Sequence, residues 1–96
     1  MSTPFVSGPP GTASFTYFDG AASRLLKTGP GSLRAVIVGV PSVSGEVTLY
    51  DGLDTSGKVI AVLDATEGRN VDFSCAFFTG LYVVVAGATN TTISFF

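Results

Sequence analysis

The chain has 96 residues, which is enough for one folded domain and too short to bury two separate hydrophobic cores. Its net charge is −2 and its five basic residues are scattered, which argues against direct nucleic-acid binding because phosphates are neutralised by clustered Lys and Arg. Hydrophobic residues make up 46 % of the chain and charged residues only 12 %, against about 25 % charged residues in an average soluble domain, so we expect a partner to cover part of the apolar surface.

Targeting signals and cysteine content point to a soluble protein. The longest apolar run, residues 81–86, is far shorter than the roughly 20 residues of a membrane-spanning helix. The first twenty residues contain no Lys or Arg, so the basic start of a secretory signal is missing. Cys75 is the only cysteine, which excludes an intrachain disulfide. We expect synthesis in the cytoplasm and no membrane partner.

The first thirteen residues differ in composition from the rest. Three prolines and two glycines lie among Ser and Thr, a composition that prevents a helix and disfavours a central strand. We predict an extended N-terminal arm over residues 1–13, followed by one domain over residues 14–96. Two alternatives remain for the arm: a disordered tail, or a segment that docks onto a neighbour through Phe5 and Val6.

Short strands are predicted along the rest of the chain, from period-two alternation or from β-branched apolar runs between turn residues. The predicted strands cover residues 14–18, 23–28, 33–40, 46–50, 59–63, 71–77, 80–86 and 91–96. Leu33, Ala35 and Ile37 are expected on one face of their strand, with Val36, Val38 and Val40 on the other. Residues 65–70 are expected to be a polar link. On the strand over residues 71–77, Cys75 is interpreted as a core residue between two phenylalanines.

The segment 45–63 is the centre of this organisation. Two strands flank a connection that contains Asp51-Gly52 and Ser56-Gly57, and both pairs have the residue types of tight turns. We therefore predict a β-hairpin with a loop of several residues.

Seven or eight short strands without helical periodicity predict an all-β fold, a single antiparallel β-sandwich of jelly-roll or Greek-key type. The connections are too short for crossover helices, although the pattern does not give the strand order. Strands over residues 36–40, 59–63 and 81–86 are apolar on both faces, whereas a two-layer sandwich hides only one. We therefore expect the protein to self-associate.

The residues expected of catalytic sites are scarce. The chain has no histidine, which excludes Ser-His-Asp and Cys-His arrangements. Asp51 and Asp54 do not match the spacing of a calcium-binding loop. Two acid pairs, Asp64 with Glu67 and Glu46 with Asp51, have the residue types of a glycosidase, but nothing in the sequence places either pair across a cleft. We expect no enzyme activity, no metal and no cofactor.

Three sequence stretches together resemble the small β-sandwich virion proteins of tailed bacteriophages. They are Leu-Lys-Thr-Gly-Pro-Gly-Ser-Leu-Arg-Ala-Val at 26–36, Val-Thr-Leu-Tyr-Asp-Gly at 47–52 with Ser-Gly-Lys-Val-Ile at 56–60, and Phe-Thr-Gly-Leu-Tyr-Val at 78–83. The likeness covers roughly residues 22–96. It implies a capsid decoration or cement protein on the virion surface, often a homotrimer, with the major capsid protein or other virion proteins as partners.

Under this interpretation the arm contacts the capsid shell and the outward strand faces carry self-association. The residues predicted for shell contact are Phe5, Val6 and Pro9. The residues predicted for self-association, from their parity on the strands, are Tyr50, Val62, Tyr82 and Phe96.

Two alternatives stay open. The protein could be a neck, tail or fibre component of the virion, since related small folds also serve there. It could instead be a carbohydrate-binding module, because β-sandwiches often present stacking rings, here Tyr17, Tyr50 and Tyr82. The absence of tryptophan weakens the carbohydrate alternative, and interface tyrosines explain the same residues.

Overall fold

The computed structural model describes residues 14–96, which form eight strands and no helix. The strands are β1 (Ser14–Asp19), β2 (Ala22–Thr28), β3 (Gly31–Val40), β4 (Glu46–Asp51), β5 (Lys58–Asp64), β6 (Arg69–Phe77), β7 (Gly80–Ala86) and β8 (Asn90–Phe95). Residues 1–13, and with them the predicted arm, lie outside the described residues. Within residues 14–96, no helix is long and apolar enough to cross a membrane.

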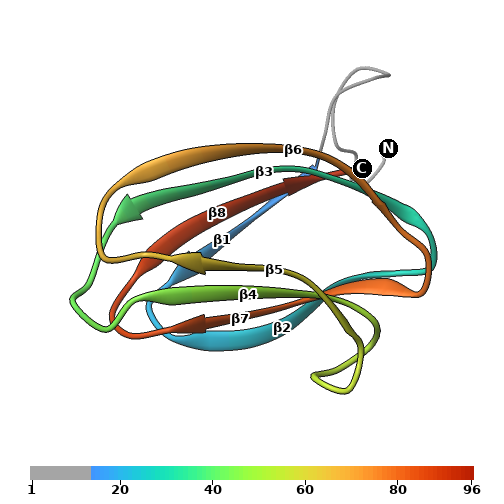
Figure 1. Cartoon of the computed structure of the whole chain (residues 1–96), viewed down its shortest axis with the longest axis horizontal. Helices are drawn as coiled ribbons and strands as arrows, with labels where there is room; N and C mark the ends of the chain where they lie inside the picture. The colour runs from blue at the N-terminus through green and yellow to red at the C-terminus, as the bar shows by residue number, and fades with distance from the viewer. Residues whose placement is uncertain (1–13) are drawn as a thin grey trace, which may run out of the picture.

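The strands form two four-stranded antiparallel sheets that face each other as a β-sandwich (Figure 1). The order in sheet A is β1-β8-β3-β6, and the order in sheet B is β2-β7-β4-β5. The prediction of an all-β antiparallel sandwich is thus confirmed at the level of the two layers. Consecutive strands from β1 to β4 lie in alternate sheets, so each short connection between them crosses from one layer to the other.

The strand pairs are nested around the predicted hairpin. The first strand pairs with the last, β2 with β7, β3 with β6, and β4 with β5, all antiparallel. The hairpin of β4 and β5 is therefore confirmed, with residues 52–57 as its loop. The chain runs as if one long hairpin with its turn at residues 52–57 had been rolled into two layers.

The core lies between the sheets and is made by the inward residue of each alternating pair. Val47 and Leu49 of β4 are fully buried, as are Val83 of β7 and Ile93 of β8. Large side chains from both sheets complete it; they are Phe18, Leu33, Phe77 and Leu81. Because the alternation places these residues inside, the residues between them must face outward.

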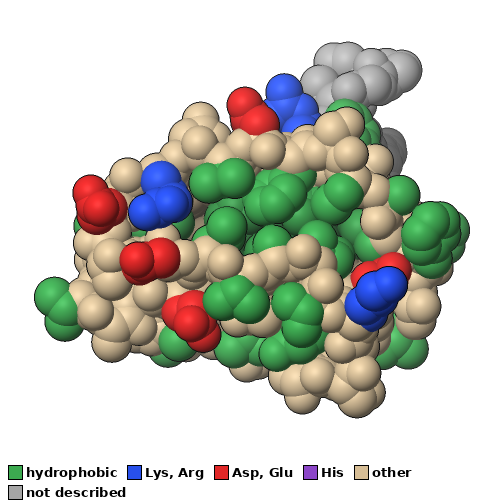
Figure 2. Space-filling view, in the orientation of Figure 1, with side chains coloured by type: hydrophobic (Ala, Val, Ile, Leu, Met, Phe, Trp, Pro, Cys, Tyr) green, Lys and Arg blue, Asp and Glu red, His purple; other side chains and the backbone are tan. Residues whose placement is uncertain are grey.

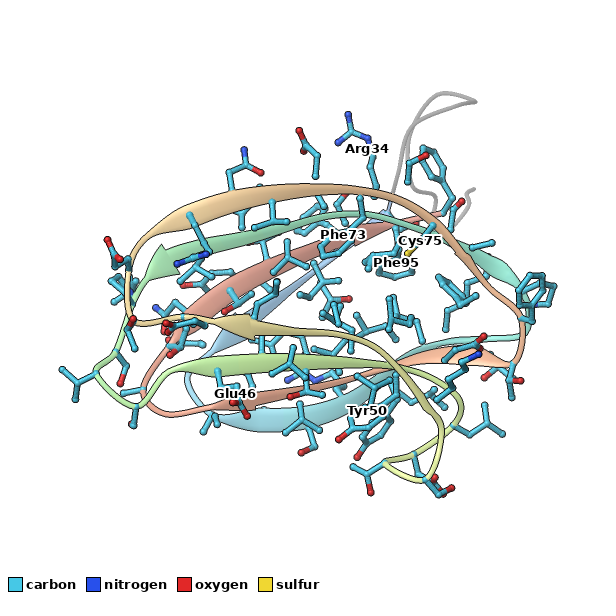
Figure 3. All side chains as sticks on the ribbon, in the orientation of Figure 1. Arg34, Glu46, Tyr50, Phe73, Cys75 and Phe95 are labelled. Atoms are coloured by element: carbon cyan, nitrogen blue, oxygen red, sulfur yellow. The ribbon has the colours of Figure 1, made fainter. Side chains whose placement is uncertain are left out.

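The core is less closed between the edge strands β5 and β6. Figure 2 shows hydrophobic side chains gathered between these two strands, and Ile60, Leu63, Phe73 and Cys75 are half-buried while packing against the core. Figure 3 shows Phe73, Cys75 and Phe95 between the sheets. The interpretation of Cys75 as a core residue is thus confirmed, although its side chain is not fully enclosed.

Strand β3 departs from the predicted alternation. Two steps along β3, from Leu33 to Ala35, match one step along β8, from Phe95 to Ser94, which marks a β-bulge at the exposed Arg34. The bulge returns Leu33 to the face of Val36 and Val38, and all three are buried. The prediction that Leu33 shares a face with Ala35 and Ile37 was therefore wrong. The polar link is also shorter than predicted, since β6 already begins at Arg69.

The antiparallel topology places the connections at two ends of the sandwich. The Phe78 end holds the connections 29–30, 52–57 and 78–79, together with the start of β1 and the end of β8. The Val43 end holds the connections 20–21, 41–45, 65–68 and 87–89.

Candidate interaction surface

The middle of sheet B presents an uncharged outer face that is rich in apolar and aromatic side chains. Inward placement of Val47 and Leu49 turns Thr48 and Tyr50 outward on β4, and the same alternation turns Tyr82 outward on β7. We call this surface the tyrosine face and define it by seven outward residues: Leu25, Thr48, Tyr50, Val59, Val62, Tyr82 and Val84.

Strand register aligns these residues in two rows across the sheet. In the first row Leu25 lies opposite Tyr82, Tyr82 opposite Tyr50, and Tyr50 opposite Val59. The centroids of the Tyr50 and Tyr82 rings are 6.4 Å apart, with the rings tilted by 58°, a separation typical of interacting aromatic pairs. None of the four residues in this row is charged.

The second row mixes hydroxyl and apolar side chains. Ser23 lies opposite Val84, Val84 opposite Thr48, and Thr48 opposite Val62, whose side chain is 56 % exposed. Beyond this row, at the Val43 end, Glu46 lies opposite Asp64. Figure 3 shows Tyr50 and Glu46 on the outer side of sheet B. The tyrosine face is thus an uncharged surface with an acidic border at one end.

A bulge widens the apolar part of β5. The register shifts between Leu49 and Tyr50 against this strand, so Ala61 lies opposite Leu49 and Val59 opposite Tyr50. Ile60 and Ala61 therefore both pack toward the core, and Val59 and Val62 both face outward. Strict period-two parity would have placed Val59 and Val62 on opposite faces.

The outer face of sheet A is more polar. Phe15, Tyr17 and Ile37 are exposed there, and Tyr17 Oη accepts a hydrogen bond of 2.9 Å from Asn90 Nδ2. Most outward positions around them carry polar side chains: Asn70, Asp72, Ser74, Thr92 and Ser94. Tyr17 is therefore separated from Tyr50 and Tyr82, which belong to the other sheet.

The structure brings together three of the four residues predicted for self-association. Tyr50, Val62 and Tyr82 lie on the tyrosine face. Phe96 lies apart from them, after the end of β8 in sheet A, where its backbone exchanges hydrogen bonds of 2.8 and 3.2 Å with Ser32. The residues predicted for shell contact, Phe5, Val6 and Pro9, lie outside the described residues.

Asp51 fastens the turn between β6 and β7. Its carboxylate accepts hydrogen bonds from the backbone N–H groups of Thr79 at 2.8 Å, Phe78 at 3.0 Å and Gly80 at 3.4 Å. The Thr79 N–H is the largest cause that lowers the pKa of Asp51 below its ordinary value of 3.8. The sequence offered no signal for this contact, because Asp51 and its partners are 27 to 29 positions apart.

Asp54 and Asp64 also hold local turns through their carboxylates. The Asp54 carboxylate accepts hydrogen bonds from the hydroxyl and N–H of Ser56, which lower its pKa. Glu46 and Asp51 lie at opposite ends of β4, about 17 Å apart for a strand of this length, beyond the roughly 5–9.5 Å between glycosidase carboxylates. In residues 14–96 no group of three or more His, Cys, Asp or Glu side chains is placed to hold a metal ion.

Comparisons with known proteins add no further assignment to this geometry. No family model, no curated protein and no solved structure matches the chain.

Proposed function

We propose that this protein is a structural component of a bacteriophage virion, a capsid decoration or cement protein that self-associates and stabilises the shell of major capsid protein. The observation that carries the proposal is the tyrosine face, an uncharged outer surface across all four strands of sheet B. In an isolated sandwich this face would stay in water, and the exposed part of its apolar side chains would gain nothing from burial. A role inside a larger assembly gives the surface a physical purpose.

We also infer that the two sheets form a jelly roll. The nested pairing and the orders β1-β8-β3-β6 and β2-β7-β4-β5 support this assignment, because a jelly roll is a long hairpin rolled into two four-stranded sheets. Jelly rolls occur in viral capsid proteins and also in lectins and cupins. The topology therefore favours a virion role without being specific to it, and the sequence resemblance selects among these classes.

Self-association through the tyrosine face is proposed to build a homotrimer. Four strands about 4.8 Å apart and about six residues long give a face of roughly 400 Å² in projection, about half of the ~800 Å² that each partner contributes to a standard interface. In a closed ring of three copies each subunit makes two contacts. The tyrosine face packs against one neighbour, and adjoining edges complete the interface.

The trimer is proposed to bridge neighbouring subunits of the capsid shell. Residues 1–13, with Phe5, Val6 and Pro9, are the proposed contacts with the major capsid protein. Once one arm of a trimer is bound, the others bind at a high effective concentration, so modest individual contacts add to a tight overall attachment. This multivalency would let a small protein reinforce a shell under outward pressure.

Two measurements test the proposal. Light scattering of the purified protein at micromolar concentration is expected to give the mass of a trimer, and a monomer would contradict self-association. In a stained gel of purified virions, a cement protein is expected in copy numbers comparable with the major capsid protein. A neck, tail or fibre component would be present in far fewer copies.

The paired rings of Tyr50 and Tyr82 keep carbohydrate binding as a second candidate function. Tyr50 and Tyr82 are half-buried, and the ring faces that remain open to water could stack against a sugar. A glycan array would show binding that is lost in Tyr50→Ala and Tyr82→Ala if the tyrosine face were a sugar site. We expect no glycan signal, because the proposed trimer covers these rings.

A further inference from the structure

The two long sides of the sandwich, each formed by one edge strand from either sheet, are enclosed to different degrees (Figure 1). On the side of β1 and β2, the connection 20–21 joins the two edge strands directly. The Arg24 guanidinium carbon lies 5.1 Å from the centroid of the Phe18 ring, and Phe18 is fully buried. The chain itself therefore covers the core on this side.

The side of β5 and β6 is open. Figure 2 shows hydrophobic side chains gathered between these two strands. We call this surface the open side and define it by five half-buried residues that pack against the core: Ile60, Ala61, Leu63, Phe73 and Cys75. Their exposed parts gain nothing from burial unless another molecule covers them.

Strand β5 is also an edge without charges to prevent further pairing. It pairs only with β4, so backbone N–H and C=O groups along its outer edge have no partner strand within residues 14–96. Residues 59–63 of β5 are all apolar, whereas the edge strand β2 carries Arg24 and Lys27, and β6 carries Asp72. Charges within edge strands usually oppose pairing with another chain. On these grounds β5 is the edge most open to a further strand.

The regular part of β5 is suited to antiparallel pairing with a second copy of itself. A bulge at Ile60 interrupts the strand, since Val59 and Ala61 lie opposite successive residues of β4. Beyond the bulge, Ala61 and Leu63 lie opposite inward residues of β4, and Val62 lies opposite the outward Thr48. Antiparallel pairing centred on Val62 places Ala61 of each copy opposite Leu63 of the other. Inward side chains then meet inward side chains.

Charge favours one orientation of the second copy. At the Val43 end, Glu46 lies opposite Asp64, and Arg69 is the cation that acts on the Asp64 carboxylate. At the Phe78 end, Lys58 lies opposite Asp51. Antiparallel pairing of β5 with β5 brings the acidic pair of each copy to the Lys58 end of the other. Antiparallel pairing of β5 with β6 of a second copy would instead bring the two acidic pairs together, which like charges disfavour.

We propose that the open side binds the open side of a second copy of this chain across a two-fold axis, with β5 antiparallel to β5 of that copy. Sheet B then continues as a sheet of eight strands, and the half-buried side chains of both copies cover one another. The open side lies between the sheets and not on the tyrosine face. The inference therefore goes beyond the proposed trimer, because this contact joins one trimer to another.

The small area of the open side makes this contact weak. A strip as long as the seven residues of β5, with about 3.3 Å per residue and about 10 Å between the sheets, covers roughly 230 Å². A standard interface takes ~800 Å² from each partner. The contact is therefore expected at high protein concentration, or between trimers held side by side on a surface, and not at micromolar concentration.

Light scattering of the full-length protein from micromolar to near-millimolar concentration measures the contact. The wild-type mass is expected to double across the series. Ala61→Lys is expected to keep its low-concentration mass, because an unpaired ammonium group would be buried near the centre of the contact. Ala22→Lys is the matched control, since Ala22 is also half-buried against the core on the other edge strand of sheet B. Its mass is expected to double as in wild type.

Cys75 reports on the open side without any substitution, because it is the only cysteine in the chain. With N-ethylmaleimide in excess, alkylation of wild-type Cys75 is expected to slow at least about threefold from the lowest to the highest protein concentration, as the covered fraction rises. In Ala61→Lys the rate is expected to stay constant. If Ala61→Lys lacks the circular dichroism of the wild type, the wild-type alkylation rate alone decides.

The outcomes separate this inference from the proposed function. A wild-type mass and a Cys75 alkylation rate that both stay constant over the series would overturn the inference and leave the trimer and the decoration role intact. Equal behaviour of folded Ala61→Lys and Ala22→Lys would also overturn it. A wild-type protein that is a monomer at micromolar concentration and a dimer at the highest concentration would support the inference and contradict the proposed trimer.

Discussion

The two sheets share one core but differ in the chemical character of their outer faces. Inside, sheet A supplies Leu33 and Ile93 and sheet B supplies Val47 and Leu49, all fully buried. Outside, sheet B presents the uncharged tyrosine face, whereas sheet A presents mainly hydroxyl, amide and carboxylate side chains around the exposed Phe15, Tyr17 and Ile37. The need to fill the sandwich explains both inner faces and the polar outer one. It does not explain the tyrosine face, and for this reason the proposed self-association is assigned to sheet B.

A charge introduced in the middle of each outer face is expected to give the largest difference between the two sheets, measured as dissociation of the oligomer. Val84 and Thr92 are matched positions, each half-buried on an inner strand of its sheet. Val84→Lys is expected to raise the dissociation constant of the oligomer at least about 100-fold, because an unpaired ammonium group would be buried at every subunit contact. Light scattering over a dilution series measures the change.

Thr92→Lys is the control for this experiment and is expected to leave the oligomer intact. Both variants should keep the far-ultraviolet circular dichroism of the wild type. Equal dissociation by the two variants, or by Thr92→Lys alone, would show that the tyrosine face is not the surface that associates.

Core truncation should erase the difference between the sheets. Leu49→Ala in sheet B and Ile93→Ala in sheet A each remove a fully buried aliphatic side chain, so both are expected to lower the free energy of unfolding by about 2–5 kcal/mol. Urea titrations at one fixed protein concentration measure this, because association adds a concentration-dependent contribution. A loss confined to one sheet would mean that the two layers do not share one cooperative core.

Asp51 lies where the two sheets are connected. Its carboxylate, on β4 of sheet B, holds the turn that joins β6 of sheet A to β7 of sheet B. Its pKa is lowered by the Thr79 N–H in the folded state, so its stabilising contribution is complete above the ordinary pKa of 3.8 and is lost as the pH falls through the lower folded pKa. Thermal melts from pH 7 to pH 2 should show this decline.

Asp51→Asn is expected to melt at a lower temperature at neutral pH and to lose less stability on acidification. Part of the decline will remain, because hydrogen bonds that Thr66 donates to the Asp64 carboxylate also lower the pKa of Asp64. Asp72→Asn removes the same charge from the exposed face of β6 and is the control. If Asp51→Asn and wild type melt alike throughout, the carboxylate does not hold the turn.

Thr91 places an unsatisfied hydroxyl on the inner side of sheet A, and its substitution is expected to change stability least. Its side chain is buried opposite Val38, and Thr91 Oγ1 has no hydrogen-bond partner among the described residues. Thr91→Val keeps the shape and removes the unsatisfied hydroxyl, so it is expected to raise the free energy of unfolding by about 1 kcal/mol. Urea titration beside wild type measures it, and a loss of stability would show that the hydroxyl is satisfied.

Much of the fold could be predicted from local pattern. Alternation placed all eight strands within about two residues of their ends, and it placed Tyr50 and Tyr82 outward. It failed where a bulge breaks the period, as at Arg34, which reverses the faces on either side. Alternation also predicts that Phe96 and Tyr82 both face outward, yet Phe96 lies on the other sheet. Alternation along one strand predicts which face a residue occupies, but it does not predict which strands are neighbours.

The sequence by itself determined the strands, their turns and the surplus of apolar side chains, because these follow from residue spacing along a single segment. The tertiary structure decided which outward faces adjoin, which side of the sandwich stays open between β5 and β6, and which N–H groups donate to the Asp51 carboxylate. Those relations join residues far apart in the chain, and they depend on the order of strands in two sheets. Period and propensity act over a few residues, so they carry no information about that order.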